Sequence, residues 1–435
     1  MRMSLFDYDI LNGKCSKYET NHLHMYVDDC IDLENLDNMT LSAYATFVHE
    51  YIHYIQHITS LYGIRIRMSD MYNRIFAKYR DYIRSNEEIN IPLKLWETDE
   101  QINRFISHFN KIEGTKTIDF NISDIEIDER EIAIAEKKKT AVWIGCYDFE
   151  NDKVDEHGFQ FGHRCVIEGM AHVIQSIINN NVSHNIIPYH AVELVIGKIM
   201  PDIAHDKKII TSICLCALLW SNPGVGFFKV LELFKQHPNW TGKDLYQSII
   251  RNYAVSYKGE EMPFYRLLNK FSNDFKGSLE ALIGTDLEYY SQVINNCISD
   301  CNKYHHRLID ILYDSDISDR EVFKEELLNH YGYPLIDGEN QSVLPLKMEG
   351  GKISAYKESA ILYGIELIMA RLLAYKKGKV CKRYPICSST MFIEDAKCDA
   401  TEECLSTQWK KSEFCIFIET LRYFEIKDKN YQDKI

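Results

Sequence analysis

The chain has 435 residues, of which 46% are hydrophobic and 12% aromatic, so it carries enough apolar surface for a large core and is not a disordered protein. Only 20 glycines and 9 prolines interrupt it, which disfavours collagen-like, low-complexity and turn-rich all-β chains and favours a mainly helical one. With 64 acidic against 50 basic residues, the formal charge of -14 makes nucleic acid and anionic membranes unfavourable partners.

Three sequence features bear on where the protein resides. Asp7 and Asp9 occur where a secretory signal peptide needs an unbroken apolar segment, so no signal peptide is predicted. The longest apolar run, residues 209–220, is shorter than the roughly 18 residues that a membrane span needs. The 13 cysteines are an odd number at irregular spacings, which is typical of reduced thiols. We therefore expect a cytoplasmic protein with no membrane partner, while its oligomeric state stays unknown.

The predicted elements begin with two short strands at residues 5–11 and 22–27, where apolar and polar side chains alternate. Helices are predicted at residues 40–63, 68–84 and 98–112. The first is the clearest in the chain, with Thr40 as its N-cap and Gly63 as its stop. Residues 117–162 change to strand patterns, and the last two strands are expected to form a hairpin that turns near residues 150–153.

From residue 163 onward the apolar spacing is helical again. It predicts helices at 163–180, 189–200, 207–220, 224–236, 283–312, 317–330 and 353–376. No repeat of fixed period is present, so a solenoid is not supported. The elements together predict an α+β fold that is mainly α, with a small antiparallel sheet. We divide it into a core (residues 1–205), an added helical region (206–350) and a C-terminal helix with a Cys-rich tail (351–435).

The first helix contains an HExxH motif made by His49, Glu50 and His53. Residues four apart on a helix lie one turn above each other, so both imidazoles can reach one ion while Glu50 reaches its open side. Zinc prefers neutral imidazole and about four tetrahedral ligands, one of which is water in catalytic sites. The ion lowers the pKa of this water toward about 7, and a nearby carboxylate can take the proton. Chance gives roughly 0.05 such patterns in this composition, so a hydrolytic zinc site is predicted.

The HExxH motif supplies two ligands, so the third protein ligand must come from elsewhere in the chain. The metzincin extension of the motif requires Gly and His where this chain has Gln56 and Thr59, which excludes that branch. His57 is rotated by about 80° around the helix from His49, so we interpret it as a packing residue. The better candidate is Glu168, at the start of a later predicted helix.

At Glu168 the chain resembles the gluzincin branch of zinc metallopeptidases, in which a Glu from a later helix joins the HExxH motif. The segment from Glu168 to Ala171 reads EGMA and is similar to the EGxA turn of aminopeptidase-like gluzincins. The resemblance implies a zincin-like core in which His49, His53 and Glu168 bind Zn2+ and Glu50 is the general base. The long separation between the two pieces implies an inserted unit.

Two details of this second piece complete the resemblance. The small side chains of Gly169 and Ala171 would let the second helix approach the first closely. Some relatives carry an acidic residue one turn after the Glu ligand, which orients a zinc-binding histidine. This chain has His172 there, which leaves His172 as an alternative ligand or a supporting residue, beside His157 and His163 as further candidates for the third ligand.

Other roles stay open at the level of sequence. Residues able to donate a hydrogen bond to an oxyanion are His163, Tyr189, His190, Tyr253 and Tyr257. The hairpin that ends in GFQFG at residues 158–162 either offers an edge strand to a peptide or only braces the next helix. The C-terminal cysteines form no C-x-x-C pair, so buried free thiols are favoured over a structural zinc site; they are Cys381, Cys387, Cys398, Cys404 and Cys415.

The sequence thus predicts a zinc-dependent intracellular metallopeptidase, an endopeptidase of narrow specificity that acts on a protein or peptide. One alternative is a carboxylate-bridged di-iron protein, because Glu50 and His53 also form an ExxH pair. That architecture needs a second ExxH, and the nearest match, Glu168 with His172, is spaced by four residues. The other alternative is a catalytically inactive peptidase-like binding or sensor module.

Overall fold

The structure is a computed structural model, and it describes most of the chain. The described residues are 16–19, 23–66, 69–93, 99–118, 120–148, 157–338, 341–345, 356–373, 381, 387, 401, 403–412 and 415–433. The strand predicted at residues 5–11 and the predicted turn at 150–153 lie outside them.

Helix α1 (Leu41–Thr59) lies at the centre of the molecule, and nearly all of its side chains from Ala43 onward are buried. The predicted N-cap is confirmed, because the Thr40 side chain accepts a hydrogen bond from the backbone N–H of Ala43. The predicted stop at Gly63 is wrong, since α1 ends at Thr59 and Gly63 belongs to a following π-helical turn, η3 (Tyr62–Ile66). A Cβ on Gly63 would lie 2.3 Å from the carbonyl oxygen of His57, so glycine is needed there for close backbone packing.

The remaining helices account for most of the described chain, so the prediction of a mainly helical α+β protein is confirmed. They are α2 (Ser69–Ser85), α3 (Glu100–Glu113), α4 (Glu129–Lys138), α5 (His163–Ile178), α6 (Ile186–Tyr189), α7 (Ala191–Ile199), α8 (Lys207–Ala217), α9 (Pro223–Gln236), α10 (Gly242–Asn252), α11 (Phe264–Ile283), α12 (Tyr289–Asn302), α13 (Arg307–Asp314), α14 (Arg320–Phe323), α15 (Asn329–Tyr331), α16 (Tyr356–Leu372), α18 (Glu403–Ser406) and α19 (Ile416–Tyr423), with short helical turns η2 (Leu36–Asn38), η4 (Pro201–Ile203), η5 (Lys324–Leu328) and η6 (Gln408–Lys410).

Helices α4, α10 and α11 are absent from the predicted elements. α4 buries only Ala135, so packing of an apolar face contributes little to it. Its first turn is held instead by Asp128, whose side chain accepts from the backbone N–H of Arg130. The run predicted as one helix at 283–312 is two helices, α12 and α13, with the second capped by the side chain of His306.

The strands form four small sheets. The strands are β1 (Lys17–Glu19), β2 (His24–Tyr26), β3 (Glu88–Ile91), β4 (Asp124–Glu126), β5 (Val142–Tyr147), β6 (His157–Phe161), β7 (Ala254–Tyr257), β8 (Glu260–Pro263), β9 (Leu335–Asp337), β10 (Ser342–Val343) and β11 (Asn430–Asp433). The sheet of order β4-β5-β6 is antiparallel, and its β5–β6 hairpin, in register Val142↔Phe161, is confirmed. The sheet beside α1 has the order β1-β2-β9-β10 and is mixed, because β2 and β9 run parallel with His24 opposite Leu335.

Two further pairs complete the sheets, and one of them joins the C-terminal strand β11 to β3. β7 and β8 form an antiparallel hairpin, whereas β11 pairs in parallel with β3. The pairings β2–β9 and β3–β11 cross the predicted boundaries near residues 205 and 350. The division into three regions stays a prediction. The regions are not structurally separate, because two of the sheets contain strands from different regions.

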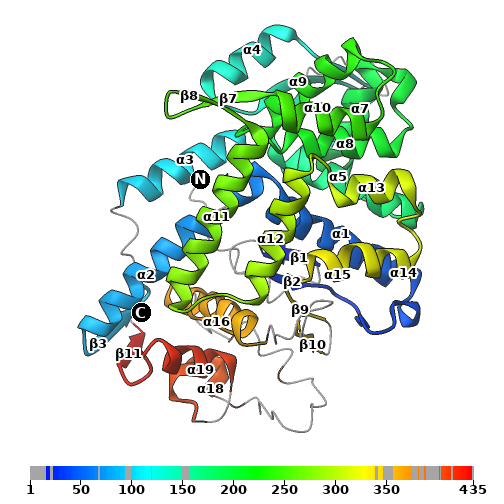
Figure 1. Ribbon diagram of the computed structural model, residues 1–435. Helices are drawn as coiled ribbons and strands as arrows, with labels where there is room; N and C mark the ends of the chain where they lie inside the picture. The colour runs from blue at the N-terminus through cyan, green and yellow to red at the C-terminus, as the bar shows by residue number, and fades with distance from the viewer. Residues whose placement is uncertain are drawn as a thin grey trace.

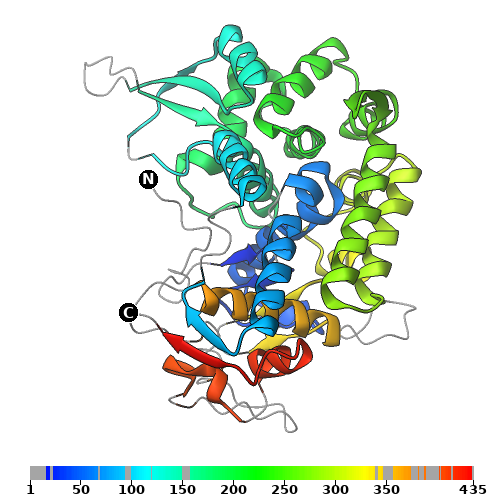
Figure 2. The same cartoon turned by 90° about the vertical axis from the view of Figure 1, so that its left-hand side faces the viewer.

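The arrangement in space places α1 between two helical groups. Figure 1 shows α5 and α7 to α10 gathered in the upper part of the molecule and α16, α18 and α19 in the lower part, with α1 between them. Figure 2, turned by 90°, shows the same separation along the vertical axis. α1 packs directly on α5, and α5 packs in turn on α7, α8 and α9. No described helix has the length and apolar character required to cross a membrane.

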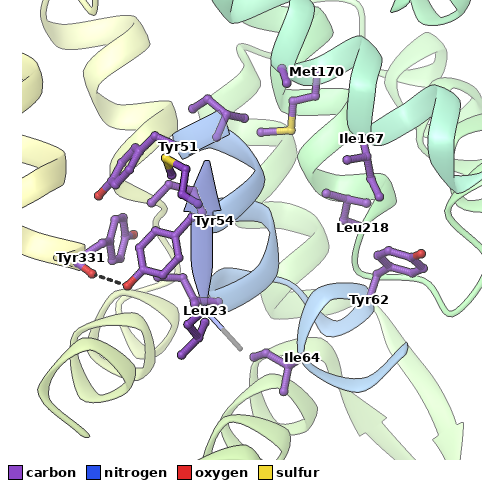
Figure 3. Packing of buried hydrophobic residues seen from close by; sticks show 14 of the residues in the cluster. Leu23, Tyr51, Tyr54, Tyr62, Ile64, Ile167, Met170, Leu218 and Tyr331 are labelled. Atoms are coloured by element: carbon purple, nitrogen blue, oxygen red, sulfur yellow. Dashed lines mark hydrogen bonds between the residues drawn. The ribbon is translucent and has the colours of Figure 1, made fainter. Parts of the chain in front are cut away.

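Two faces of α1 are held by different contacts, as Figure 3 shows. On one face, the hydroxyls of Tyr51 and Tyr54 donate to the backbone oxygens of Gly332 (2.7 Å) and Tyr331 (2.9 Å). On the other side lie Ile167 and Met170 of α5, both buried. Because buried hydroxyls need partners, these bonds fix the rotation of α1 about its axis. The HExxH residues are thereby held against α5.

Candidate metal centre

The residues predicted as zinc ligands come together at the contact between α1 and α5. His49 and His53 point from successive turns of α1, and Glu168 comes from the second turn of α5. The two Nε2 atoms are 3.2 Å apart. The Oε2 atom of Glu168 lies 3.5 Å from Nε2 of His49 and 3.3 Å from Nε2 of His53. We call these three residues the α1–α5 centre.

The three mutual distances match what a tetrahedral zinc ion requires. With zinc–nitrogen and zinc–oxygen bonds of about 2.0–2.1 Å, the ligand atoms of a tetrahedral site lie about 3.3 Å from one another. The observed distances of 3.2, 3.3 and 3.5 Å surround that value. The α1–α5 centre therefore fits zinc without any rearrangement of its ligands.

Two glutamine side chains orient the imidazole rings. His49 donates from Nδ1 to Oε1 of Gln175 on α5 (3.0 Å), and His53 donates from Nδ1 to Oε1 of Gln56 (2.9 Å). The amide of Gln56 is fixed in turn, because its Nε2 donates to the backbone oxygen of Ile167 (3.0 Å). Hydrogen bonds of this kind set the tautomer of a metal-binding histidine.

This tautomer has a direct consequence for the centre. Since both rings carry their proton on Nδ1, both neutral rings present an Nε2 lone pair to the other ring and to the carboxylate of Glu168. Lone pairs and a carboxylate that converge within 3.2–3.5 Å repel one another unless a proton or a cation lies between them. The arrangement thus attracts a cation.

The centre is buried but reaches the surface at one point. The side chains of His49 and His53 are 7% and 8% exposed, whereas that of Glu168 is 20% exposed. Burial alone would raise the pKa of Glu168, but with a proton on Nε2 the positive charges of His53 and His49 and their hydrogen bonds outweigh it and hold the pKa well below its ordinary value. Glu168 is therefore a carboxylate, the form that binds metal.

Glu50, the predicted general base, is buried beside the same centre. Burial raises the pKa of its carboxyl group, the charges of His49 and His53 oppose this, and that of Glu168 adds to it. The backbone of Tyr18 in β1 also hydrogen-bonds this carboxyl group and lowers its pKa. Its Oε2 atom is buried without a hydrogen-bond partner. A buried carboxyl oxygen without a partner is costly, and a cation or water at the centre would relieve that cost.

The other histidines considered as ligands lie elsewhere. His57 accepts a hydrogen bond from the Tyr18 hydroxyl (2.8 Å) and packs against Phe275, consistent with the packing role predicted for it. His163 is buried between the rings of Tyr62 and Phe109. His157 is exposed at the start of β6, with its ring stacked on Phe120. None of the three belongs to the described groups of side chains that are spaced for a metal ion.

Gly169 was predicted to let α5 pack closely on the HExxH helix, but it faces a different helix. A Cβ on Gly169 would lie 2.7 Å from a methyl carbon of Val192, in the first turn of α7. The missing side chain therefore lets α7, not α1, approach α5 closely. This approach brings His190 and Glu193 to His172, and these three form a second group spaced for a metal ion.

The loop that joins α5 to α7, residues 179–190, includes the short helix α6. It carries His184 and Tyr189 and lies between the two groups. Their rings are stacked, with centroids 4.2 Å apart and an angle of 15° between the planes. The centroid of the His184 ring lies 5.7 Å from that of the His49 ring and 5.2 Å from that of the His172 ring. His184 also donates from Nε2 to the Gln175 oxygen that His49 uses (2.9 Å). Burial lowers the pKa of His172 and of His184 to about 4, so both rings are neutral at neutral pH.

The structure separates the five candidate oxyanion donors. Among the five, Tyr189 is the residue whose described ring contacts include a ligand of the α1–α5 centre. The centroids of the Tyr189 and His49 rings are 6.0 Å apart. His190 lies against His172, with ring centroids 4.2 Å apart. Tyr253 packs against Trp220 and Tyr257 against Phe271, away from the centre.

Two further sequence-based possibilities have different outcomes. β6 is an edge strand, but its outer edge at Gln160 is occupied by Thr115, which bonds both the backbone N–H and the backbone oxygen of Gln160. A peptide could not pair there without displacing Thr115. In the C-terminal tail, Cys398 lies outside the described residues, so the structure does not test the less favoured alternative of a structural zinc site there.

Gln56, Gln175 and His184 are site residues that the sequence analysis does not identify. Gln56 stands three residues after His53, and Gln175 stands seven residues after Glu168, so each shares a helix face with a ligand. That spacing is a usable signal, but it becomes specific only once α1 and α5 are known to pack together.

No protein-family model, no curated protein and no solved structure matches this chain. The function of the α1–α5 centre therefore has to be inferred from its geometry and chemistry.

Proposed function

We propose that this protein is a zinc-dependent metallopeptidase in which His49, His53 and Glu168 bind the ion and Glu50 is the general base. One observation carries the proposal: three ligand atoms on two helices lie 3.2–3.5 Å from one another beside a buried carboxyl group. The donor set of two imidazoles and one carboxylate is that of catalytic zinc sites. That the enzyme is an intracellular endopeptidase with few substrates is part of the proposal and is an expectation from the sequence.

When bound, zinc supplies Lewis-acid chemistry, because it acidifies water and polarises a carbonyl group. The residues of the chain supply the other functions. Glu50 accepts a proton from the attacking water and passes it to the leaving amine. Its buried position suits the role of a base, since burial raises its pKa above the ordinary value for a carboxyl group.

Tyr189 is the donor that we assign to the carbonyl oxygen of the scissile peptide. Its ring lies beside His49, and His184 stacks on it and limits its movement. Peptide hydrolysis builds negative charge on that oxygen, and a prepositioned hydroxyl stabilises it. Arg164, one turn before Glu168 on α5, interacts electrostatically with both Glu168 and Tyr189 and adds a positive charge at the same edge.

The di-iron alternative is disfavoured by the second group of side chains. A carboxylate-bridged di-iron site needs Glu and His from one helix to converge on the same metal pair. Here Glu168 joins His49 and His53, whereas His172 joins His190 and Glu193. Glu168 and His172 thus do not act as a second ExxH pair.

The decisive experiment compares the wild-type protein with Glu50→Gln. Both are purified, their zinc content is measured, and each is incubated with a degenerate peptide library whose products are identified by mass spectrometry. We expect Glu50→Gln to keep zinc and to lose cleavage by about 100- to 10,000-fold, the contribution of a general base. Glu232→Gln, an exposed substitution on α9, is the matched control and should cleave as the wild type does.

Two results would overturn the proposal. Equal cleavage by Glu50→Gln would remove the general base. A wild-type protein that contains zinc but gives no cleavage that a chelator abolishes would instead favour the alternative of an inactive binding or sensor module.

A further inference from the structure

A second group of side chains on α5 has the donors of a zinc site and takes no part in the proposed reaction. It consists of His172 on α5, His190 at the junction of α6 and α7, and Glu193 in the first turn of α7. One ligand atom from each lies within 4.8 Å of the others. We call these residues the α5–α7 group.

We propose that the α5–α7 group binds a second zinc ion. The proposal does not depend on the peptidase function, because it concerns other ligands and is measured as metal content. Two imidazoles and one carboxylate are the same donor set as in the α1–α5 centre.

His172 provides the first observation beyond composition. Its side chain is buried, with only 3% of its surface exposed, and its Nδ1 atom is buried without a hydrogen-bond partner. A buried imidazole nitrogen without a partner costs free energy, and a metal ion would satisfy it. The ring meets His190 edge-on, with ring centroids 4.2 Å apart, so its surroundings contain a second donor.

His190 and Glu193 provide the second observation. Nδ1 of His190 donates to Oε2 of Glu193 at 3.0 Å, a distance close to the edge of about 3.3 Å between zinc ligands. Burial alone would raise the pKa of Glu193, but the hydrogen bond and charge of His190 lower it below its ordinary value, so Glu193 is a carboxylate. An ion would replace the shared proton and leave His190 protonated on Nε2 instead.

The exposure of the α5–α7 group allows its side chains to adjust around an ion. Its three ligand atoms lie within 4.8 Å of one another and the tetrahedral edge is about 3.3 Å, so no pair has to approach by more than about 1.5 Å. The side chains of His190 and Glu193 are 36% and 29% exposed, which leaves them room to adjust. The backbone needs no movement, because Gly169 already admits Val192 of α7 against α5.

The position of the group indicates what the ion would do. An ion there would join α5 to α7 and so close the loop that carries His184 and Tyr189. Their stacked rings lie between the two groups, in contact with His49 on one side and His172 on the other. The second ion would thus hold this loop against the α1–α5 centre, in a positioning role.

The test is a zinc titration of chelator-treated full-length protein, followed by gel filtration and measurement of bound zinc by mass spectrometry. We expect two zinc ions per chain in the wild type. The double variant His190→Ala/Glu193→Gln and the double variant His49→Ala/His53→Ala should each retain one. Exposed substitutions of the same types, His205→Ala/Glu232→Gln, are the control and should retain two.

The outcomes separate the two proposals. One zinc in both the wild type and His190→Ala/Glu193→Gln overturns the second site and leaves the α1–α5 centre intact. One zinc in the wild type and in His49→Ala/His53→Ala, with none in His190→Ala/Glu193→Gln, would support the second site and overturn the α1–α5 centre. The single substitution Glu193→Gln, which is close to isosteric, guards against misfolding: it should weaken the second binding step at least about tenfold, and an unchanged isotherm contradicts the proposal.

Discussion

Two buried groups of histidine and carboxylate side chains in this protein use their ring nitrogens differently. At His24, Nε2 lies 3.2 Å from Asp337 and Nδ1 lies 3.3 Å from Glu366, so each nitrogen faces its own carboxylate. In the α1–α5 centre, each Nδ1 donates to a glutamine and each Nε2 faces the same carboxylate as the other. In the first arrangement each nitrogen can donate a proton to a different carboxylate, whereas in the second one proton or one cation can be shared by both Nε2 atoms and the carboxylate.

The comparison indicates that the group facing Nδ1 distinguishes two kinds of buried histidine. A carboxylate at Nδ1 favours a protonated, ion-paired ring, whereas a neutral amide at Nδ1 favours a ring that binds a metal ion. Burial alone lowers the pKa of His24, but Glu366 and Asp337 outweigh it and raise the pKa above its ordinary value, so His24 is the positive member of an ion-paired group. The neutral amide oxygens of Gln56 and Gln175 supply no such charge. With Nδ1 directed to a glutamine, each ring turns its Nε2 atom toward Glu168, where a metal ion could bind.

The largest expected effect is on the zinc affinity of the α1–α5 centre, which should depend on His53 and not on His24. His53→Ala should lower the affinity of the α1–α5 centre by two to three orders of magnitude, because one of four ligands carries about a quarter of a zinc-binding free energy of about 10–16 kcal/mol. His24→Ala should leave it unchanged. Both are measured by competition with a chromogenic chelator in a Glu193→Gln background, and equal affinities would break the comparison.

The glutamine contacts should have the next largest effect. Gln175→Met keeps the size of the side chain but removes the acceptor for His49, and we expect the zinc affinity to fall about 10- to 100-fold, as for other supporting partners of metal ligands. The same competition assay measures it. Gln236→Met, at the exposed end of α9, is the control. An unchanged affinity in Gln175→Met would show that Nδ1 does not need this partner.

A glycine substitution separates helix packing from metal coordination. Gly169→Ala places a methyl group 2.7 Å from Val192, so the free energy of unfolding should fall by about 1–3 kcal/mol. The affinity of the α1–α5 centre should change little, because Gly169 faces α7. Gly277→Ala on α11 has open space at its Cβ and should instead stabilise by up to about 1 kcal/mol. Denaturant unfolding of both variants gives the comparison.

The smallest expected effect is the pH dependence that His24 adds. Because its folded pKa is raised above 6.5, its contribution to stability is fully present below about pH 6.5 and is lost as pH rises through the folded pKa. The melting temperature of wild type should exceed that of His24→Gln at pH 6, by no more than about 2 °C in a chain of this size, and the difference should shrink as pH rises through the folded pKa. A difference that grows with pH would contradict the ion-paired assignment.

The sequence alone was informative where a local pattern decides local structure. The apolar spacing after Thr40 and the hydroxyl of Thr40 predict α1 and its first residue, and the i, i+4 spacing of His49 and His53 places both rings on one face. The strand patterns in residues 140–149 and 154–162 predict the β5–β6 hairpin. These predictions depend on bonds between residues close in the chain.

Other features depend on contacts between distant segments, and sequence patterns do not encode them. The stop at Gly63 is a different kind of error, because that glycine allows a close local approach to the backbone of His57 and does not cap α1. The parallel pairing of β2 with β9 joins residues 24–26 to 335–337, so the sheet is mixed where an antiparallel one was expected. Gly169 was assigned to the contact with α1, but it admits α7.

For the candidate site, the amino-acid sequence by itself determined the ligand types, because a helix fixes the spacing of His49, Glu50 and His53 wherever it lies. Only the tertiary structure decided that Glu168 completes this set within 3.5 Å and that His172 joins His190 and Glu193 instead. The physical reason is that both glutamate and histidine on α5 suit a metal ion chemically. The rotation of α5, set by its packing between α1 and α7, determines which of them faces which partner.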